Sequence, residues 1–317
     1  MKKLAVLLIA ITAIAIAALV AVFVLSKSAP PEPIPVDLQV VRYNIPAESN
    51  AFTYFLRATN HVWWPPSSEA RATIYSLMDG RTNWDETFVS DLVRSNELAL
   101  TEVDRGLACE RFQFPSATND HSLPTSFFAW RTIIQVACLR VAQSLRSGRE
   151  EESFDQAFKV LRFGKMLEDN HGCLVYCSLG TAFKRMALAE MERIAISNSL
   201  SSSRLITHAS ALSSYESEPE SFRNAIRNQY AATCDLIDRL TRGNLKESEM
   251  DFLTPRSMRF LVRLPYFFQP DRTRQLLAET CRTWMRNADR TVADIAPDCP
   301  SYTGSLPDSP IRAFLTP

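Results

Sequence analysis

Glycine is scarce in this sequence. Only 8 of the 317 residues are glycine, whereas glycine makes up about 7% of an average protein. Tight-turn β architectures and phosphate-binding loops depend on glycine, because it alone adopts positive φ without a steric cost. The shortage therefore argues against a β fold and against a nucleotide-cradling loop, and it favours long helices.

An excess of charge of either sign is also absent. The chain has 35 Lys and Arg residues against 35 Asp and Glu residues, so its formal net charge is zero. This balance excludes a strongly basic arm or an acidic tail as the dominant feature, and we expect no nucleic-acid partner. The hydrophobic content of 46% is ample for a core and excludes disorder over most of the chain.

The sequence motifs of common enzyme classes are missing as well. It has no nucleophile elbow, zinc-protease helix motif, Walker loop or dinucleotide fingerprint. Residues 120–122 (Asp-His-Ser) are the residue types of a hydrolase triad, but consecutive residues rarely reach triad geometry. The neighbouring carboxylates Glu190 and Glu192, and those of residues 150–152, are interpreted as solvated helix faces. No catalytic residue is predicted.

Residues 4–25 form an unbroken apolar run with Thr12 as its one polar member. At 1.5 Å per residue the run spans about 33 Å, enough to cross a hydrocarbon core of about 30 Å. A cleavable signal peptide usually has an apolar core of only about 7–15 residues, so the length favours an uncleaved transmembrane signal anchor. The small residues at alternate positions of 13–17 leave a cleaved signal as the alternative, which would make the protein secreted.

The charges that flank the run predict its orientation. Lys2 and Lys3 precede it, while Lys27 is followed by Glu32 and Asp37. Positive charge favours the cytoplasmic side. We therefore expect a cytoplasmic stub at residues 1–3 and a single-pass protein whose main domain is extracytoplasmic, or periplasmic in a Gram-negative cell.

Proline marks the boundaries of the remaining parts. Residues 26–46 are a proline-rich spacer, residues 47–296 a helical extracytoplasmic domain and residues 297–317 a proline-rich tail. Within the spacer, residues 36–43 alternate apolar and polar side chains, which is typical of a short strand or an extended entry segment.

Apolar periodicity and end signals predict the helices of the domain. They cover about 83–110, 125–147, 153–170, 173–198 and 217–243, and a last helix starts at Asp271 or Thr273. The helix predicted over 83–110 has an apolar stripe along one face, made of Val89, Leu92, Val93, Leu100, Val103 and Leu107. Gly148 is expected as a left-handed C-terminal residue, and Ser153 with Gln156 and Ser217 with Glu220 have capping-box spacing.

These elements define the expected fold class. It is all-α, with an N-terminal transmembrane helix followed by a helical bundle or a tetratricopeptide-like helical array. Residues 147–170 are similar to the second half of one tetratricopeptide unit, but no repeat of fixed period accompanies them.

The seven cysteines are an odd number and cannot all pair with one another. Five lie in helical stripes, where cysteine behaves as a small hydrophobic residue. Buried thiols are the favoured interpretation, and a disulfide from Cys299 to a helix is the alternative in an exported protein. His171, Cys173 and Cys177 are the one compact set of metal-ligand types, but a second ligand pair is missing. We predict neither a metal nor a cofactor.

Two sets of residues point to possible partners. Arg256, Arg259 and Arg263 have helical spacing beside aromatic residues, which suits an anionic envelope polymer, lipid headgroups or an acidic partner. A solvated face with intramolecular ion pairs is the commoner explanation of such a cluster. Trp63 and Trp64 are either a ligand platform or a packing contact at a helix end.

Three pieces of the sequence, taken in order, carry a resemblance. They are the anchor, residues 50–55 (NAFTYF) and residues 266–273 (YFFQPDRT). The helix between Gly148 and Gly172 and the helix that follows it are similar too. With them the chain resembles a loosely defined group of uncharacterised, exported, all-helical bacterial proteins over most of residues 45–290. The resemblance implies fold and location, and it assigns no site residue.

The expected function is that of an interaction or scaffold module of the cell envelope. It would be held in the membrane by residues 4–25 and would bind a protein or an anionic envelope partner. The alternative is an envelope hydrolase that uses carboxylates in a groove between helices. A deep pocket with two convergent acids would favour the hydrolase, and a broad shallow groove would weaken it.

Overall fold

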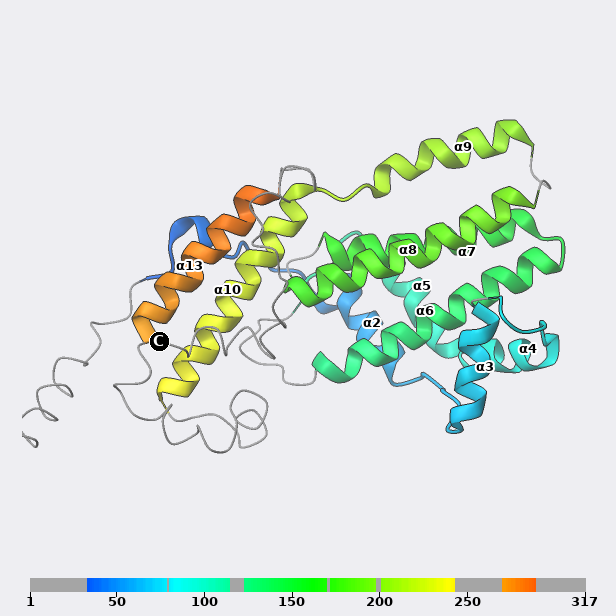
Figure 1. Cartoon of the computed structure of the whole chain (residues 1–317), viewed down its shortest axis with the longest axis horizontal. Coiled ribbons are helices and arrows are strands. Elements are labelled where there is room, and N and C mark those ends of the chain that lie inside the picture. Colours follow the sequence, from blue (N-terminus) through cyan, green and yellow to red (C-terminus); the bar gives the residue numbers. More distant parts are fainter. Residues whose placement is uncertain are drawn as a thin grey trace, which may run out of the picture. The chain divides into compact units, whose positions relative to one another are not determined.

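The computed structural model describes residues 33–78, 80–114, 123–169, 172–197, 201–242 and 270–288. The chain divides into a larger unit, Val40–Gln229, and a smaller unit made of Met1–Gln39 and Tyr230–Pro317. Every regular element in the described ranges is a helix (Figure 1), and these ranges contain no strand. The all-α class is therefore confirmed.

The larger unit holds most of the helices. They are the 3-10 helix η2 (Ala47–Ser49), α2 (Ala51–Thr59), α3 (Ser68–Met78), α4 (Glu86–Ser95), α5 (Glu97–Ala108), α6 (Leu123–Arg146), α7 (Glu150–Glu168), α8 (Leu174–Ile196), α9 (Ser202–Leu212) and the 3-10 helix η3 (Ser213–Tyr215). The helix α10 (Pro219–Thr241) begins in this unit and ends in the smaller one.

Three long helices, α6, α7 and α8, pack in sequence order (Figure 1). Gly148 connects α6 to α7 with φ of +72°, the left-handed conformation that the sequence predicts there. Inside α7 and α8, Gly164 and Gly180 let the two backbones touch. A Cβ atom on Gly180 would lie 2.5 Å from the carbonyl oxygen of Gly164. Gly164 also lies against Lys184 of α8, and Gly180 lies against Glu168 of α7, so each glycine leaves room for a longer side chain of the other helix.

Aromatic side chains fill the centre of the larger unit. Phe55 of α2 meets Phe163 of α7 edge to face, with ring centroids 4.2 Å apart. Trp130 of α6 is completely buried, and its Nε1 donates to the carbonyl oxygen of Phe55 at 2.8 Å. A buried indole N–H needs such a partner, so this bond fixes α2 on α6.

The predicted helix over 83–110 is two helices that meet at Asn96. The side chain of Asn96 is fully buried and makes three hydrogen bonds. Its Oδ1 accepts from the Trp63 N–H at 2.9 Å, and its Nδ2 donates to the carbonyl oxygens of Trp63 and Leu92. Asparagine competes with helical backbone bonding in this way. The predicted apolar stripe is nevertheless buried in both helices, as expected.

Two predicted capping boxes are wrong. Ser153 lies inside α7, where its buried hydroxyl donates to the carbonyl oxygen of Val141 at 2.8 Å. Ser217 lies two residues before the first residue of α10 and bonds to side chains of α7 and α8 instead. The sequence signals also missed α3 and α9, which have few buried residues.

In the smaller unit the structure describes η1 (Val36–Leu38), the end of α10 and α13 (Pro270–Asn287). Of the two interpretations of residues 36–43, the strand is wrong, since the segment starts with this 3-10 turn and the rest of it has no regular structure. Asp37 is bound by Arg282 of α13 at 2.7 Å. Leu277 and Cys281 of α13 are buried, whereas Trp284 is 42% exposed.

In the part of the chain that the structure describes, no helix combines the length and the apolar content needed to cross a membrane. The predicted anchor at residues 4–25 lies outside that part. So do the triad-like residues 120–122, His171, the arginine-rich residues 256–263 and the tail at 297–317.

Candidate functional site

A groove runs between α5, α6 and α7 in the larger unit, with a cavity volume of about 300 Å³. Its floor is apolar and consists of Leu100, Val103, Ile133, Ile134, Val160 and Phe163, and each of these side chains is at most 7% exposed. The half-buried Ala137 of α6 also lines it. A cavity of this size with an apolar lining is within the range of ligand pockets.

The position of α5 explains why the groove exists. α5 packs mainly against α2 and only slightly against α6 and α7. Gly106 makes this possible, because a Cβ atom there would lie 2.4 Å from a ring carbon of Phe55. The face of α5 that carries Leu100, Val103 and Asp104 is turned toward α6 and α7, and its side chains leave a gap there.

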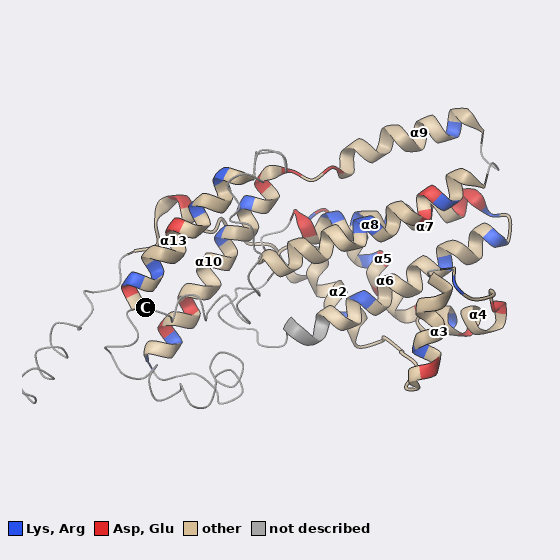
Figure 2. Ribbon diagram, in the orientation of Figure 1, with Lys and Arg blue, Asp and Glu red and all other residues tan. Residues whose placement is uncertain are grey.

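Charged side chains surround the mouth of the groove. Asp104 of α5 and Lys159 of α7 form an ion pair across it, with 2.9 Å between Oδ2 and Nζ. Arg140 lies 3.6 Å from Glu97, and Glu152 lies 2.8 Å from Arg149. Asp155 is exposed and is the one charged residue of the lining without an ion pair to another described residue. Both signs of charge are interspersed along the helices (Figure 2).

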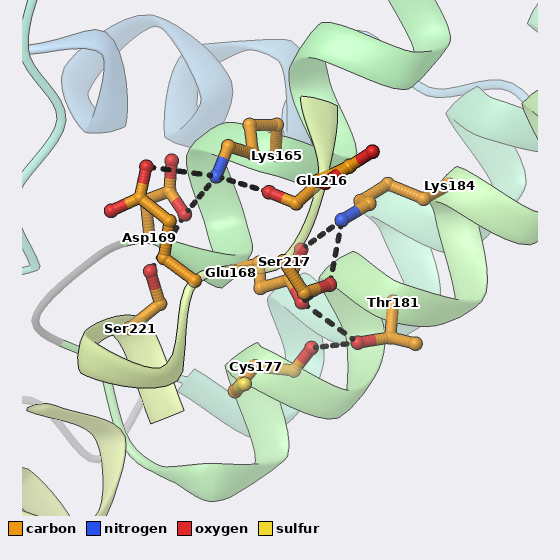
Figure 3. Close-up of polar contacts among 10 residues, drawn as sticks. Lys165, Glu168, Asp169, Cys177, Thr181, Lys184, Glu216, Ser217 and Ser221 are labelled. Carbon is orange, nitrogen blue, oxygen red and sulfur yellow. Dashed lines mark hydrogen bonds and ion pairs between the residues drawn. The ribbon is translucent and has the colours of Figure 1, made fainter. Parts of the chain in front are cut away.

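A second polar feature, which we call the clamp, consists of Lys165, Glu168, Asp169, Lys184, Ser217 and Ser221 (Figure 3). Lys184 of α8 donates to Glu168 of α7 with 2.5 Å between Nζ and Oε2, and these side chains are only 9% and 5% exposed. Ser217 accepts from Lys184 at 2.9 Å and donates to Oε1 of Glu168. Gly164 lies directly against Lys184, and Gly180 lies directly against Glu168, so the absence of side chains at the two glycines gives this pair its space between α7 and α8.

The other half of the clamp holds the chain that leads into α10. Lys165 donates to the carbonyl oxygen of Glu216 and to Asp169, both at 2.8 Å. Ser221, in the first turn of α10, donates to the same oxygen of Asp169 at 2.8 Å. Residues 216–221 are thus bound to the C-terminal end of α7 and to the middle of α8.

The chemistry of the clamp is structural. A Ser–Lys nucleophile needs an unprotonated amine as its base, but the Lys184 amine donates to both Glu168 and Ser217. The clamp satisfies a buried charge pair.

Glu190 corrects one sequence interpretation. It was expected on a solvated face with Glu192, but it is 6% exposed, whereas Glu192 is exposed. Burial raises the pKa of Glu190, although Arg193 opposes the shift from 2.8 Å away. Arg193 also donates to the carbonyl oxygen of Met78, which links the end of α3 to α8.

Six cysteines lie in the described residues, and all six are free thiols. Cys138, Cys177, Cys234 and Cys281 are buried, as the sequence pattern indicates, while Cys109 and Cys173 are half-buried. Burial raises the pKa of Cys177 to about 11. Among the residues the structure describes, no group of three or more His, Cys, Asp or Glu side chains is arranged for a metal ion.

The two tryptophans differ. Trp64 packs against the core and its ring lies 6.4 Å from that of Tyr75, which fits the packing interpretation. The Trp63 side chain is 45% exposed, but its backbone is fixed by Asn96. Neither lines the groove.

Sequence reasoning missed the residues that make up the groove and the clamp. Asp104, Asp155 and Lys159 are ordinary charges on amphipathic helices when only the sequence is known. One sequence signal could have indicated the clamp. In both α7 and α8 a glycine inside the helix is followed four residues later by a charged residue, Glu168 in α7 and Lys184 in α8. No protein-family model, curated protein or solved structure shows a match to this chain.

Proposed function

We propose that the protein is a membrane-anchored interaction module of the cell envelope, with residues 4–25 as its anchor and the groove between α5, α6 and α7 as its binding surface. The observation that carries the proposal is the apolar floor beneath a charged mouth. Protein interfaces place apolar contacts at the centre and polar groups at the rim in the same way. The long helices α6, α7 and α8, which pack in sequence order, support a bundle or array as the scaffold.

The groove gives the hydrolase alternative little support. It does hold three carboxylates, Asp104, Glu152 and Asp155. A hydrolase would use one of them as an acid and another as a base. Asp104 and Glu152, however, are each engaged by a cation at the rim, and the floor between them is hydrocarbon.

The location is tested by topology. A reporter that is active only outside the cytoplasm, fused after Pro317, should be active in the native host. Activity of a cytoplasm-only reporter at the same position would refute the proposed orientation.

The binding surface is tested by photo-crosslinking in intact host membranes. Benzoylphenylalanine replaces Gln156, which lines the groove, and replaces the exposed Glu192 of α8 as the matched control. We expect a discrete crosslinked species of higher mass from position 156 and none from position 192. Equal crosslinking from both positions, or none from position 156, would contradict the proposal.

A further inference from the structure

We propose that the groove binds a protein segment in which an aromatic side chain is flanked by Lys or Arg. This inference rests on the proposed function and names the chemistry of the partner. It follows from the volume of the cavity, the composition of its floor and the charges at its mouth.

The volume sets the size of the group that enters. An apolar cavity of about 150 Å³ is known to hold one benzene molecule, and the groove offers about 300 Å³. It therefore has room for a two-ring aromatic group such as indole. Aromatic anchors in apolar pockets also supply much of the binding energy at protein interfaces.

The floor excludes a polar group at the bottom of the groove. Each of its six side chains is aliphatic or aromatic. A charged or amide group placed there would lose its hydration without gaining a hydrogen bond, which is costly. The inserted part of the partner must therefore be hydrocarbon.

The mouth sets the charge of the residues next to the anchor. Of the five charged side chains in the lining, Asp104, Glu152 and Asp155 are acidic and only Arg140 and Lys159 are basic. Lys159 is bound to Asp104 and Arg140 lies near Glu97, so the rim cations already have acidic neighbours. A cation of the partner is attracted to Asp155, which has no ion pair within the described residues, whereas an anion is repelled because acidic side chains outnumber basic ones in the lining.

The test uses the full chain in nanodiscs of neutral phosphatidylcholine, with empty nanodiscs as a blank. The probe is a dye-labelled peptide, acetyl-Ala-Lys-Trp-Lys-Ala-amide, followed by fluorescence anisotropy. Two matched peptides separate charge from the anchor, one with Glu in place of both Lys residues and one with Ala in place of Trp. We expect both matched peptides to bind at least about tenfold more weakly. Binding of the Lys-Trp-Lys peptide should weaken as salt is added, because the charges at the rim are exposed and are screened.

Variants of the chain locate the binding. Ala137→Leu narrows the groove from α6 and should abolish the preference for Trp over Ala. Asp155→Lys reverses an exposed charge. It should weaken binding of the Lys-flanked peptide about three- to tenfold, because an exposed attraction is replaced by a repulsion of similar size. Glu192→Lys makes the same reversal on α8 and should change nothing. Thermal melting checks that each variant is folded.

The proposal is overturned if the Lys-Trp-Lys peptide does not bind, if either matched peptide binds as well, or if Asp155→Lys and Glu192→Lys have equal effects. These failures are distinct from failure of the proposed function. If position 156 crosslinks specifically but the Lys-Trp-Lys peptide binds no better than the matched peptides, the groove is still a binding surface but its partner has a different chemistry. Peptide preference without crosslinking would leave this binding chemistry but remove its role in the envelope.

Discussion

The buried pair of Lys184 and Glu168 should make a large contribution to stability when one partner alone is removed. Lys184→Met preserves the length and most of the volume of the side chain but leaves the Glu168 carboxylate 5% exposed and without its cation. Breaking a buried pair in this way typically costs about 3–5 kcal/mol. Ser217 still donates to Glu168, and Thr181 does so at 3.5 Å, so we expect the lower end.

The expected loss in the free energy of unfolding is therefore about 3 kcal/mol, or about 6–12 °C in melting temperature for a unit of this size. The assay is denaturant unfolding of the full chain in detergent, followed by circular dichroism at 222 nm. Replacing both partners, as Lys184→Met with Glu168→Leu, should recover most of the loss because no buried charge remains.

A matched control lies on α7. Lys159→Met makes the same chemical change in the pair with Asp104, but those side chains are 53% and 46% exposed. Exposed pairs contribute about 0–1 kcal/mol. If the two Lys→Met variants lose similar amounts of stability, or if the double variant is as unstable as Lys184→Met, the clamp does not depend on burial as argued.

Three further predictions concern other buried features. Gly180→Ala should destabilise by about 1–3 kcal/mol, because its Cβ would lie 2.5 Å from the Gly164 carbonyl oxygen and must push α7 and α8 apart; a thermal melt that matches the wild type would refute the close contact. The Asn96→Ala variant leaves the part-buried N–H and carbonyl of Trp63 without their side-chain partners and should cost about 1–3 kcal/mol. Hydrogen exchange at the Trp63 amide should become faster, and unchanged exchange would contradict the role of Asn96. Burial raises the pKa of Glu190 above 4.5, so the cost of ionising this carboxyl in the folded protein grows as pH rises through that raised pKa. The free energy of unfolding of Glu190→Gln, relative to that of the wild type, should therefore be higher at pH 8 than at pH 4. A difference between the two proteins that does not vary with pH would contradict this.

The helices were largely predictable, and the reason is local. Each of the long ones carries an apolar stripe or a glycine end signal, such as Gly148, that a neighbouring element does not change. The break at Asn96 was not predictable, because the apolar stripe continues through it. What divides the helix is a bond to the backbone of Trp63, 33 residues earlier in the chain.

The candidate site depends even more on distant residues. The lining of the groove comes from three separate helices, α5, α6 and α7, which only the folded chain brings together. Glu168 and Lys184 look like solvated charges until α7 and α8 are placed together. Glu190 misled for the same reason, since the sequence does not show that Cys138 and Arg193 enclose it.

The distribution of the buried thiols allows the two units to be followed separately in one experiment. Cys138 belongs to the larger unit, and Cys234 and Cys281 belong to the smaller one. Burial raises the pKa of each of these thiols, so alkylation has to wait for local unfolding to expose the sulfur. Mass-spectrometric mapping of alkylation against time then yields an opening rate for each unit in the unmodified wild-type chain.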